Sequence, residues 1–104
     1  KRGTFNKVTI FFPDPWPKKR HNKRRLVNLD FMTRLCFIVR DKGIIHMATD
    51  SIDYAVQMKE LCGAINGLKR VRGEQEKIHV SMRRPSKYSK KAIDKITDLV
   101  WQWK

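Results

Sequence analysis

The feature that most constrains the fold is a short apolar run that ends abruptly in prolines. Residues 8–12 are β-branched or aromatic, without an alternation of polar side chains. This pattern is typical of a strand buried on both faces of a parallel sheet. Pro13, Pro15 and Pro17 follow at once, and proline can neither donate to a strand ladder nor continue a regular helix. We therefore expect a buried strand with a rigid loop at its carboxyl end.

Further along the chain, helical and strand spacing alternate. Apolar residues recur every three or four positions from 28 to 39, which predicts an amphipathic helix ended by Gly43 in a left-handed cap. Residues 44–49 predict a second strand, after which Asp50 or Ser51 caps another helix. The order strand, helix, strand, helix predicts a right-handed parallel α/β unit. The second helix is expected to bury Ile52, Ala55, Val56 and Cys62 and to stop at Gly63.

After Gly67 the pattern is weaker. Short strands are predicted over 68–71 and 78–82, with a polar turn over 72–77 between them. Residues 96–103 are rich in Val, Leu and Trp. They predict a final strand that pairs antiparallel at one side of the sheet.

The charge of the chain points to an anionic partner. Its 104 residues hold 24 Lys and Arg against 10 Asp and Glu, a formal net charge of +14. Self-repulsion of this size destabilises a compact chain unless an anion neutralises it. Nucleic acid is the leading candidate for that partner, and an anionic membrane surface is the weaker one.

Length and residue usage narrow the class of protein. The length suits one domain over residues 1–104, and the apolar runs are too short to cross a bilayer. Cys36 and Cys62 lie in apolar patterns and are expected to be reduced core residues of an intracellular protein. Because the sequence opens on Lys1 and runs directly into a strand, we expect a fragment of a longer protein.

Two acids follow the two predicted parallel strands. Asp14 and Asp50 should therefore lie at the same edge of the sheet, where open α/β folds bind ligands. Carboxylates there can accept hydrogen bonds from an amide-and-amine edge or stabilise a developing cation. Asp50 could equally be only a helix cap, and the alternative for Asp14 is a turn former. The rigid loop and the neighbouring aromatic ring favour a functional role for Asp14.

The loop leads into an aromatic residue and then a basic block. Trp16 could stack on a flat nucleic-acid base, or it could pack as a core residue at the edge of the sheet. Its place between two prolines favours partial exposure. Residues 18–25 contain six Lys and Arg, which could hold phosphates without reading sequence. A second basic group around Pro85 and Tyr88 could grip another stretch of backbone; it comprises Arg83, Arg84, Lys87, Lys90 and Lys91.

Several other kinds of site are excluded by spacing. His21, His46, His79 and the cysteines do not have the spacing of metal ligands, so no metal is expected. His46, inside an apolar strand, is interpreted as a core histidine with satisfied hydrogen bonds. The sequence has no glycine-rich phosphate loop or nucleophile elbow, which argues against hydrolysis by a catalytic triad.

Two motifs resemble a known family. Residues 12–26, FPDPWPKKRHNKRRL, resemble the signature of the tRNA (guanine-N7)-methyltransferases, and residues 46–50, HMATD, followed by Tyr54-Ala55, resemble its second block. The resemblance implies the C-terminal half of a cytoplasmic, Rossmann-like class I methyltransferase, with parallel strands and a terminal antiparallel pair. Such an enzyme transfers a methyl group from S-adenosylmethionine to the variable-loop guanine of tRNA.

The resemblance also implies roles for individual residues. Asp14 would be the catalytic acid and, with Pro15 and Trp16, would lie beside the cofactor. The closing block departs from the family at Ser89, which replaces an acid. The glycine-rich cofactor turn is absent, so most of the cofactor would be held outside this chain. The alternative is a non-catalytic, basic RNA-binding module derived from such an enzyme; the resemblance leaves the oligomeric state open. The implied tRNA contacts are Lys18, Arg20, His21, Lys23, Arg24, Arg25, Asp50, Ser86, Lys87, Tyr88 and Ser89.

Overall fold

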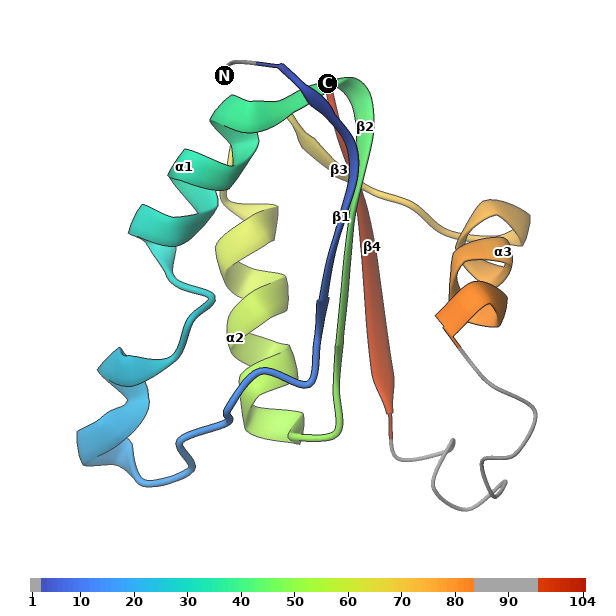
Figure 1. Ribbon diagram of the computed structural model, residues 1–104. Coiled ribbons are helices and arrows are strands. Elements are labelled where there is room, and N and C mark those ends of the chain that lie inside the picture. Colours follow the sequence, from blue (N-terminus) through green and yellow to red (C-terminus); the bar gives the residue numbers. More distant parts are fainter. Residues whose placement is uncertain (1–2, 84–95) are drawn as a thin grey trace.

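The computed structural model describes residues 3–83 and 96–104, which form a mixed α/β arrangement around one sheet (Figure 1). This confirms the α/β class predicted from the alternating spacing. In chain order the elements are β1 (Phe5–Phe11), the 3-10 helix η1 (Lys19–Arg24), α1 (Leu29–Ile38), β2 (Val39–Thr49), α2 (Ile52–Gly63), β3 (Leu68–Arg70), α3 (Glu74–Arg83) and β4 (Thr97–Trp103).

The sheet has the strand order β1-β2-β4-β3. Strands β1 and β2 are parallel, with Val8 opposite Ile45, as the strand–helix–strand pattern predicts. Strand β4 is antiparallel to β2 and also to β3. The predicted antiparallel pairing of the last strand is confirmed, but β4 pairs along both edges because the short strand β3 lies outside it.

The two faces of the sheet are covered by different helices. Helices α1 and α2 lie on one face and α3 on the other (Figure 1). Ile45 and Met47 of β2 belong to the apolar core, together with Met32 of α1 and Tyr54 of α2. His46 lies between them in sequence and therefore points to the opposite face, where its ring meets that of His79 on α3. The face under α3 is accordingly more polar than the face under α1 and α2.

The predicted left-handed cap at Gly43 is wrong. Helix α1 ends at Ile38, β2 begins at the next residue, and the left-handed conformation is adopted by Lys42, with φ 70°. Gly43 is buried in β2, where an added Cβ would lie 2.5 Å from Cγ1 of Val39 and 2.8 Å from the carbonyl oxygen of Arg40. This position needs glycine because of the close approach of the chain and not because of its φ.

The strand predicted over 78–82 is part of helix α3. Ile78, Val80 and Met82 alternate with polar residues in sequence, which suggested a strand. Yet Ile78 and Met82 are 54% and 70% exposed, whereas His79 and Arg83, four residues apart, contact residues of the sheet. The buried side of this helix is thus polar, and apolar periodicity could not reveal it.

Three burial expectations also change. Strand β1 is not buried on both faces, since only Ile10 of its residues is buried. In α2, Ile52 is 80% exposed and Val56 is exposed, while Ala55 and Cys62 are buried as predicted, together with Tyr54 and Met58. Ser51 is the N-cap of α2, because its side chain accepts a hydrogen bond from the backbone N–H of Tyr54. Asp50 is therefore not the helix cap.

Both cysteines are free and buried, as predicted. Burial raises the pKa of the Cys36 thiol; burial and the neighbouring Cys36 raise that of Cys62 to about 12. Both side chains therefore behave as small apolar groups of the core. Among residues 3–83 and 96–104, none of the helices has the length and apolar character to span a membrane.

Candidate functional site

The carboxyl ends of β1 and β2 form the edge to which the candidate acids belong. The pairing continues one residue beyond β1, because the N–H of Phe12 donates to the carbonyl oxygen of Ala48 over 2.7 Å. Asp14 and Asp50 each come two residues after one of these partners, and both are exposed. The structure thus brings the two predicted acids to one edge of the sheet, and neither is buried in the interior.

The loop that carries Asp14 has an unusual backbone. Phe12 and Trp16 have φ values of 53° and 41°, in the left-handed region that residues other than glycine rarely adopt. Between them, Pro13 and Pro15 fix their own φ angles. Such a conformation persists only where the surroundings hold it, so the shape of this loop depends on contacts made by other parts of the chain.

Trp16 is partly buried, in agreement with its predicted partial exposure. The ring of His21 meets it edge-on, with centroids 5.9 Å apart, and the guanidinium of Arg24 lies 5.2 Å from its ring centroid. The loop and the basic block are therefore in contact through this ring. Stacking of a base on Trp16 stays a prediction.

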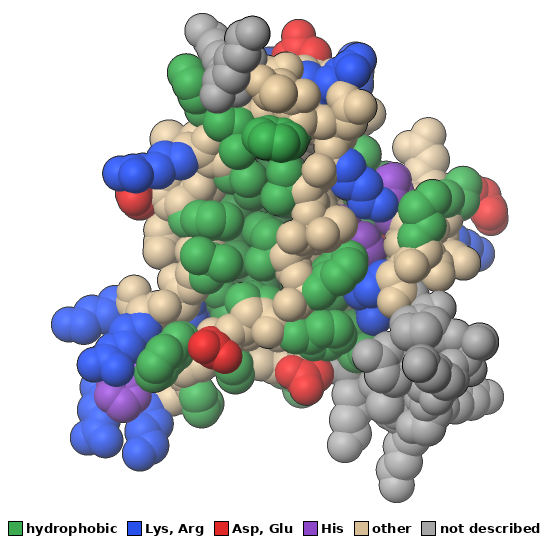
Figure 2. Space-filling view, in the orientation of Figure 1, with side chains coloured by type: hydrophobic (Ala, Val, Ile, Leu, Met, Phe, Trp, Pro, Cys, Tyr) green, Lys and Arg blue, Asp and Glu red, His purple; other side chains and the backbone are tan. Residues whose placement is uncertain are grey.

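The basic block forms η1, and none of its residues is buried. Figure 2 shows Lys and Arg side chains gathered at the lower left, where Figure 1 places this helix. The ion pairs found among the described residues involve none of the basic side chains from 18 to 24. Positive charge that no acid neutralises is what phosphate binding requires. The exposed cations are Lys18, Lys19, Arg20, Lys23 and Arg24.

Arg25 differs from the rest of this block, and the prediction that it contacts phosphate needs correction. It is only 2% exposed. Its Nε donates to the carbonyl oxygen of Pro15 over 2.6 Å, its Nη2 pairs with Oδ2 of Asp53 over 2.6 Å, and its Nη1 donates to Oε1 of Gln57. The guanidinium is therefore engaged within the protein and is not free to bind phosphate.

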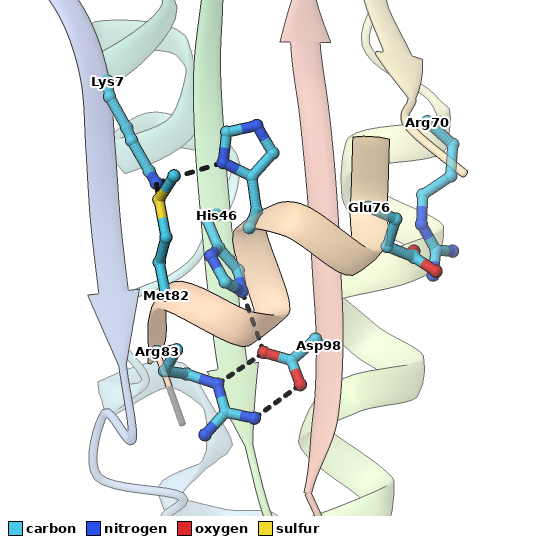
Figure 3. A network of polar contacts seen from close by, with 8 residues as sticks. Lys7, His46, Arg70, Glu76, Met82, Arg83 and Asp98 are labelled. Carbon is cyan, nitrogen blue, oxygen red and sulfur yellow. Dashed lines mark hydrogen bonds and ion pairs between the residues drawn. The ribbon is translucent and has the colours of Figure 1, made fainter. Parts of the chain in front are cut away.

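A second polar group lies between the sheet and α3 (Figure 3). Oδ1 of Asp98 on β4 is 2.8 Å from Nε2 of His46 and accepts from Nε of Arg83 over 2.6 Å, while Oδ2 accepts from Nη2 of Arg83 over 2.6 Å. Burial by itself raises the pKa of Asp98, but the hydrogen bonds and charges of His46 and Arg83 outweigh it and lower the pKa. We call these three residues the Asp98 network.

The Asp98 network corrects two expectations. The sequence places Arg83 in a second basic group that could bind the nucleic-acid backbone, but its side chain is buried and paired with a carboxylate. His46 is a core histidine as predicted, although only Nε2 has a partner and Nδ1 is buried without one in the described part of the chain. The sequence pattern did not identify Asp98. Because the pattern predicts a strand over 78–82, it does not place Arg83 one helical turn after His79, on the side of α3 that faces the sheet.

Lys7 of β1 contributes to the same face. Its Nζ lies 3.0 Å from Nδ1 of His79, and since an ammonium group can only donate, this nitrogen must accept and the ring must be neutral. Burial lowers the pKa of His79, and the positive charges of Lys7 and His46 lower it further. The hydrogen bond between Lys7 and His79 thus requires an uncharged His79.

We expect the free energy of unfolding of the full-length protein to fall as the pH decreases below the ordinary His79 pKa of 6.5. The folded-state pKa of His79 is lowered, so the unfolded chain binds the proton more readily, and the loss continues until the folded-state pKa is reached. Urea unfolding between about pH 8 and about pH 5 measures this. A His79→Gln variant should show a smaller decrease; an equal decrease in both proteins would contradict the assignment.

Some predicted site residues lie outside the part of the chain that the structure describes. These are Ser86, Lys87, Tyr88 and Ser89, together with the basic residues Arg84, Lys90 and Lys91. Within the described residues, no group of three or more His, Cys, Asp or Glu side chains is arranged to hold a metal ion.

Comparison with known proteins defines the class. A family model described as "Putative methyltransferase" matches residues 1–100. The chain therefore belongs to this methyltransferase family.

Three curated relatives that the chain resembles have the same name. The chain is 41% identical over 98 residues to a tRNA (guanine-N(7)-)-methyltransferase of Mycolicibacterium gilvum, a match that covers 91% of this chain and 37% of that protein. A protein of the same name from Xanthomonas campestris pv. campestris is 41% identical over 99 residues, covering 95% and 38%. One from Mycobacterium sp. (strain KMS) is 39% identical over 103 residues, covering 96% and 37%. The chain thus spans less than two fifths of the length of these curated relatives.

Proposed function

We propose that this chain is the C-terminal portion of a tRNA (guanine-N7)-methyltransferase that uses S-adenosylmethionine and modifies the variable-loop guanine of tRNA in the cytoplasm. The observation that carries the proposal is the edge of the sheet where Asp14 and Asp50 follow two adjacent parallel strands beside the exposed cations of η1. The names of the relatives support the proposal, because proteins that match more than nine tenths of this chain are named for that activity.

The sheet supports a Rossmann-like class I fold for the whole domain. Two parallel strands are followed by an antiparallel pair in the order β1-β2-β4-β3. Among the described residues β1 pairs only with β2, and its aromatic side chains Phe5 and Phe11 are exposed. Figure 2 shows hydrophobic side chains gathered beside β1, between the regions where Figure 1 places α1 and β1. An unpaired edge beside exposed apolar surface suits further strands of the same sheet, supplied by the rest of the domain.

The chemistry needs little from the protein beyond alignment and charge. When bound, S-adenosylmethionine supplies a methyl group on a sulfonium; the bond from guanine N7 to the methyl carbon forms as the carbon–sulfur bond breaks. N7 carries a lone pair and no proton, so no general base is required. The exposed carboxylate of Asp14 can stabilise the positive charge that the guanine acquires, and Asp50 can accept hydrogen bonds from its N–H groups.

The described residues fit the cofactor in part. The loop of Asp14, Pro15 and Trp16 offers a carboxylate and an aromatic ring beside the edge where it would lie. The ribose and adenine would be held by the portion of the enzyme outside this chain. The chain would therefore contribute the reacting end of the site and the tRNA-binding surface.

The tRNA contacts proposed for the described part of the chain are Lys18, Arg20, His21, Lys23, Arg24 and Asp50. Outside it, Ser86, Lys87, Tyr88 and Ser89 are proposed from the family resemblance alone. The departure at Ser89 favours a second candidate function, a non-catalytic RNA-binding module. A methyl-transfer assay with unmodified tRNA and full-length protein separates the two, because only the enzyme incorporates label at guanine N7.

We expect the affinity of the full-length protein for unmodified tRNA to fall steeply with salt, because phosphate contacts release counterions. An Arg20→Gln substitution should weaken binding and reduce the slope of log K against log salt by about 1. Fluorescence anisotropy over a salt series measures both. Lys59→Gln, which removes one exposed charge from α2, should leave the slope unchanged. Binding that is insensitive to salt would contradict the proposed tRNA surface.

A further inference from the structure

We propose that Arg25 is a positioning residue that fixes the Asp14 loop against helix α2 and so sets the placement of Asp14 relative to Asp50. Its catalytic consequence rests on the proposed function. The contact itself rests on geometry. Arg25 ends the basic block, yet its guanidinium points into the protein and binds three partners on two separate segments.

Arg25 connects the segments that contain Asp14 and Asp50. Pro15, whose carbonyl oxygen accepts from Nε, directly follows Asp14 in sequence. Asp53 and Gln57 lie in the first two turns of α2, and this helix begins two residues after Asp50. One side chain therefore joins the loop of Asp14 to the helix that follows Asp50.

The loop has few means of holding itself in place. Pro13, Pro15 and Pro17 have no backbone N–H, so at these positions it can be held only through carbonyl oxygens or side chains. Its two left-handed residues make an external restraint necessary. The bond from Arg25 to the Pro15 carbonyl supplies such a restraint at the position next to Asp14.

Arginine suits this task better than lysine. The planar guanidinium donates to three acceptors in different directions at once, whereas a lysine ammonium is a single point charge. The guanidinium also lies 4.7 Å from the ring centroid of Tyr54, whose hydroxyl accepts from the N–H of Val27 over 2.9 Å. Arg25 is thus held by its three hydrogen-bond acceptors and by the Tyr54 ring, whereas Arg24 next to it is exposed.

The test compares full-length Arg25→Lys with Arg34→Lys, the same substitution at an exposed position of α1. In protein labelled with 5-fluorotryptophan, the Trp16 signal, assigned with a Trp16→Phe variant, reports the loop by ¹⁹F NMR. We expect this signal to shift or broaden in Arg25→Lys and to stay unchanged in Arg34→Lys. We also expect kcat to fall about 10- to 100-fold, with the KM for tRNA nearly unchanged.

The outcomes are distinguishable. An unchanged Trp16 signal in Arg25→Lys overturns the proposal, as does a changed signal with normal kcat in an active enzyme. A raised KM with a reduced salt slope and normal kcat also overturns it, because Arg25 would then be a phosphate contact. If the wild-type protein transfers no methyl group, the proposed function fails and the Trp16 signal alone decides the loop contact. Gln57→Leu, measured in the same way, replaces Arg25→Lys if that variant does not fold.

Discussion

Full-length protein carrying Asp14→Ala is expected to lose methyl transfer to tRNA almost completely while keeping its fold. In the proposed function, the carboxylate would stabilise charge that develops only as the guanine becomes cationic, so its removal should lower kcat and not raise KM. Loss of one such electrostatic group costs about 100- to 1,000-fold in kcat in comparable cases. Single-turnover transfer of labelled methyl groups to unmodified tRNA measures the step directly.

The control for Asp14→Ala is an exposed aspartate at the opposite end of the sheet. Asp41 lies near the start of β2 and is exposed, so Asp41→Ala removes the same charge away from the proposed site. Affinity for tRNA should be unchanged or slightly higher in Asp14→Ala, because a negative charge near phosphate has been removed. Near-normal turnover by Asp14→Ala would refute its catalytic assignment.

The largest effect on stability is expected at the Asp98 network. Asp98→Ala leaves the guanidinium of Arg83 and the ring of His46 buried without their shared partner. Removing one member of a buried ion pair typically costs about 3 to 5 kcal/mol. We expect a loss of that size in the free energy of unfolding, measured by urea denaturation of the full-length protein.

Two comparisons show whether the loss comes from the uncompensated charge. The double variant Asp98→Leu with Arg83→Met removes both charges and should recover much of the stability, since apolar replacement of a whole buried pair is often neutral. Asp30→Ala breaks the exposed pair of Asp30 with Arg34 on α1 and should cost less than about 1 kcal/mol. A double variant as unstable as Asp98→Ala would contradict this account of the network.

The core of the α/β unit could be predicted because its signals are local. The apolar runs at 8–12 and 44–49 overlap the parallel strands, and the helical spacing from 28 to 39 covers α1, although the expected end at Gly43 lies beyond the actual end at Ile38. The edge shared by Asp14 and Asp50 follows from this order alone, because parallel strands joined by a crossover helix end on the same side.

The helix α3 could not be predicted in the same way. Its exposed residues Ile78 and Met82 are apolar, while its contacts with the sheet are made by His79 and Arg83. A polar buried face becomes stable only when its partners are present, here Lys7 and Asp98, which are far away in sequence. Hydrophobic periodicity carries no information about such pairing.

By itself, the sequence determined the α/β order, the edge at which the two acids lie and the excess of positive charge beside it. Only the tertiary structure decided which cations remain available to a ligand. Arg24 and Arg25 are adjacent and chemically identical, yet one is exposed and the other is buried against Pro15, Asp53 and Gln57. The physical reason is that a charge is free or engaged according to the acceptors that distant segments bring to it, and composition cannot specify that arrangement.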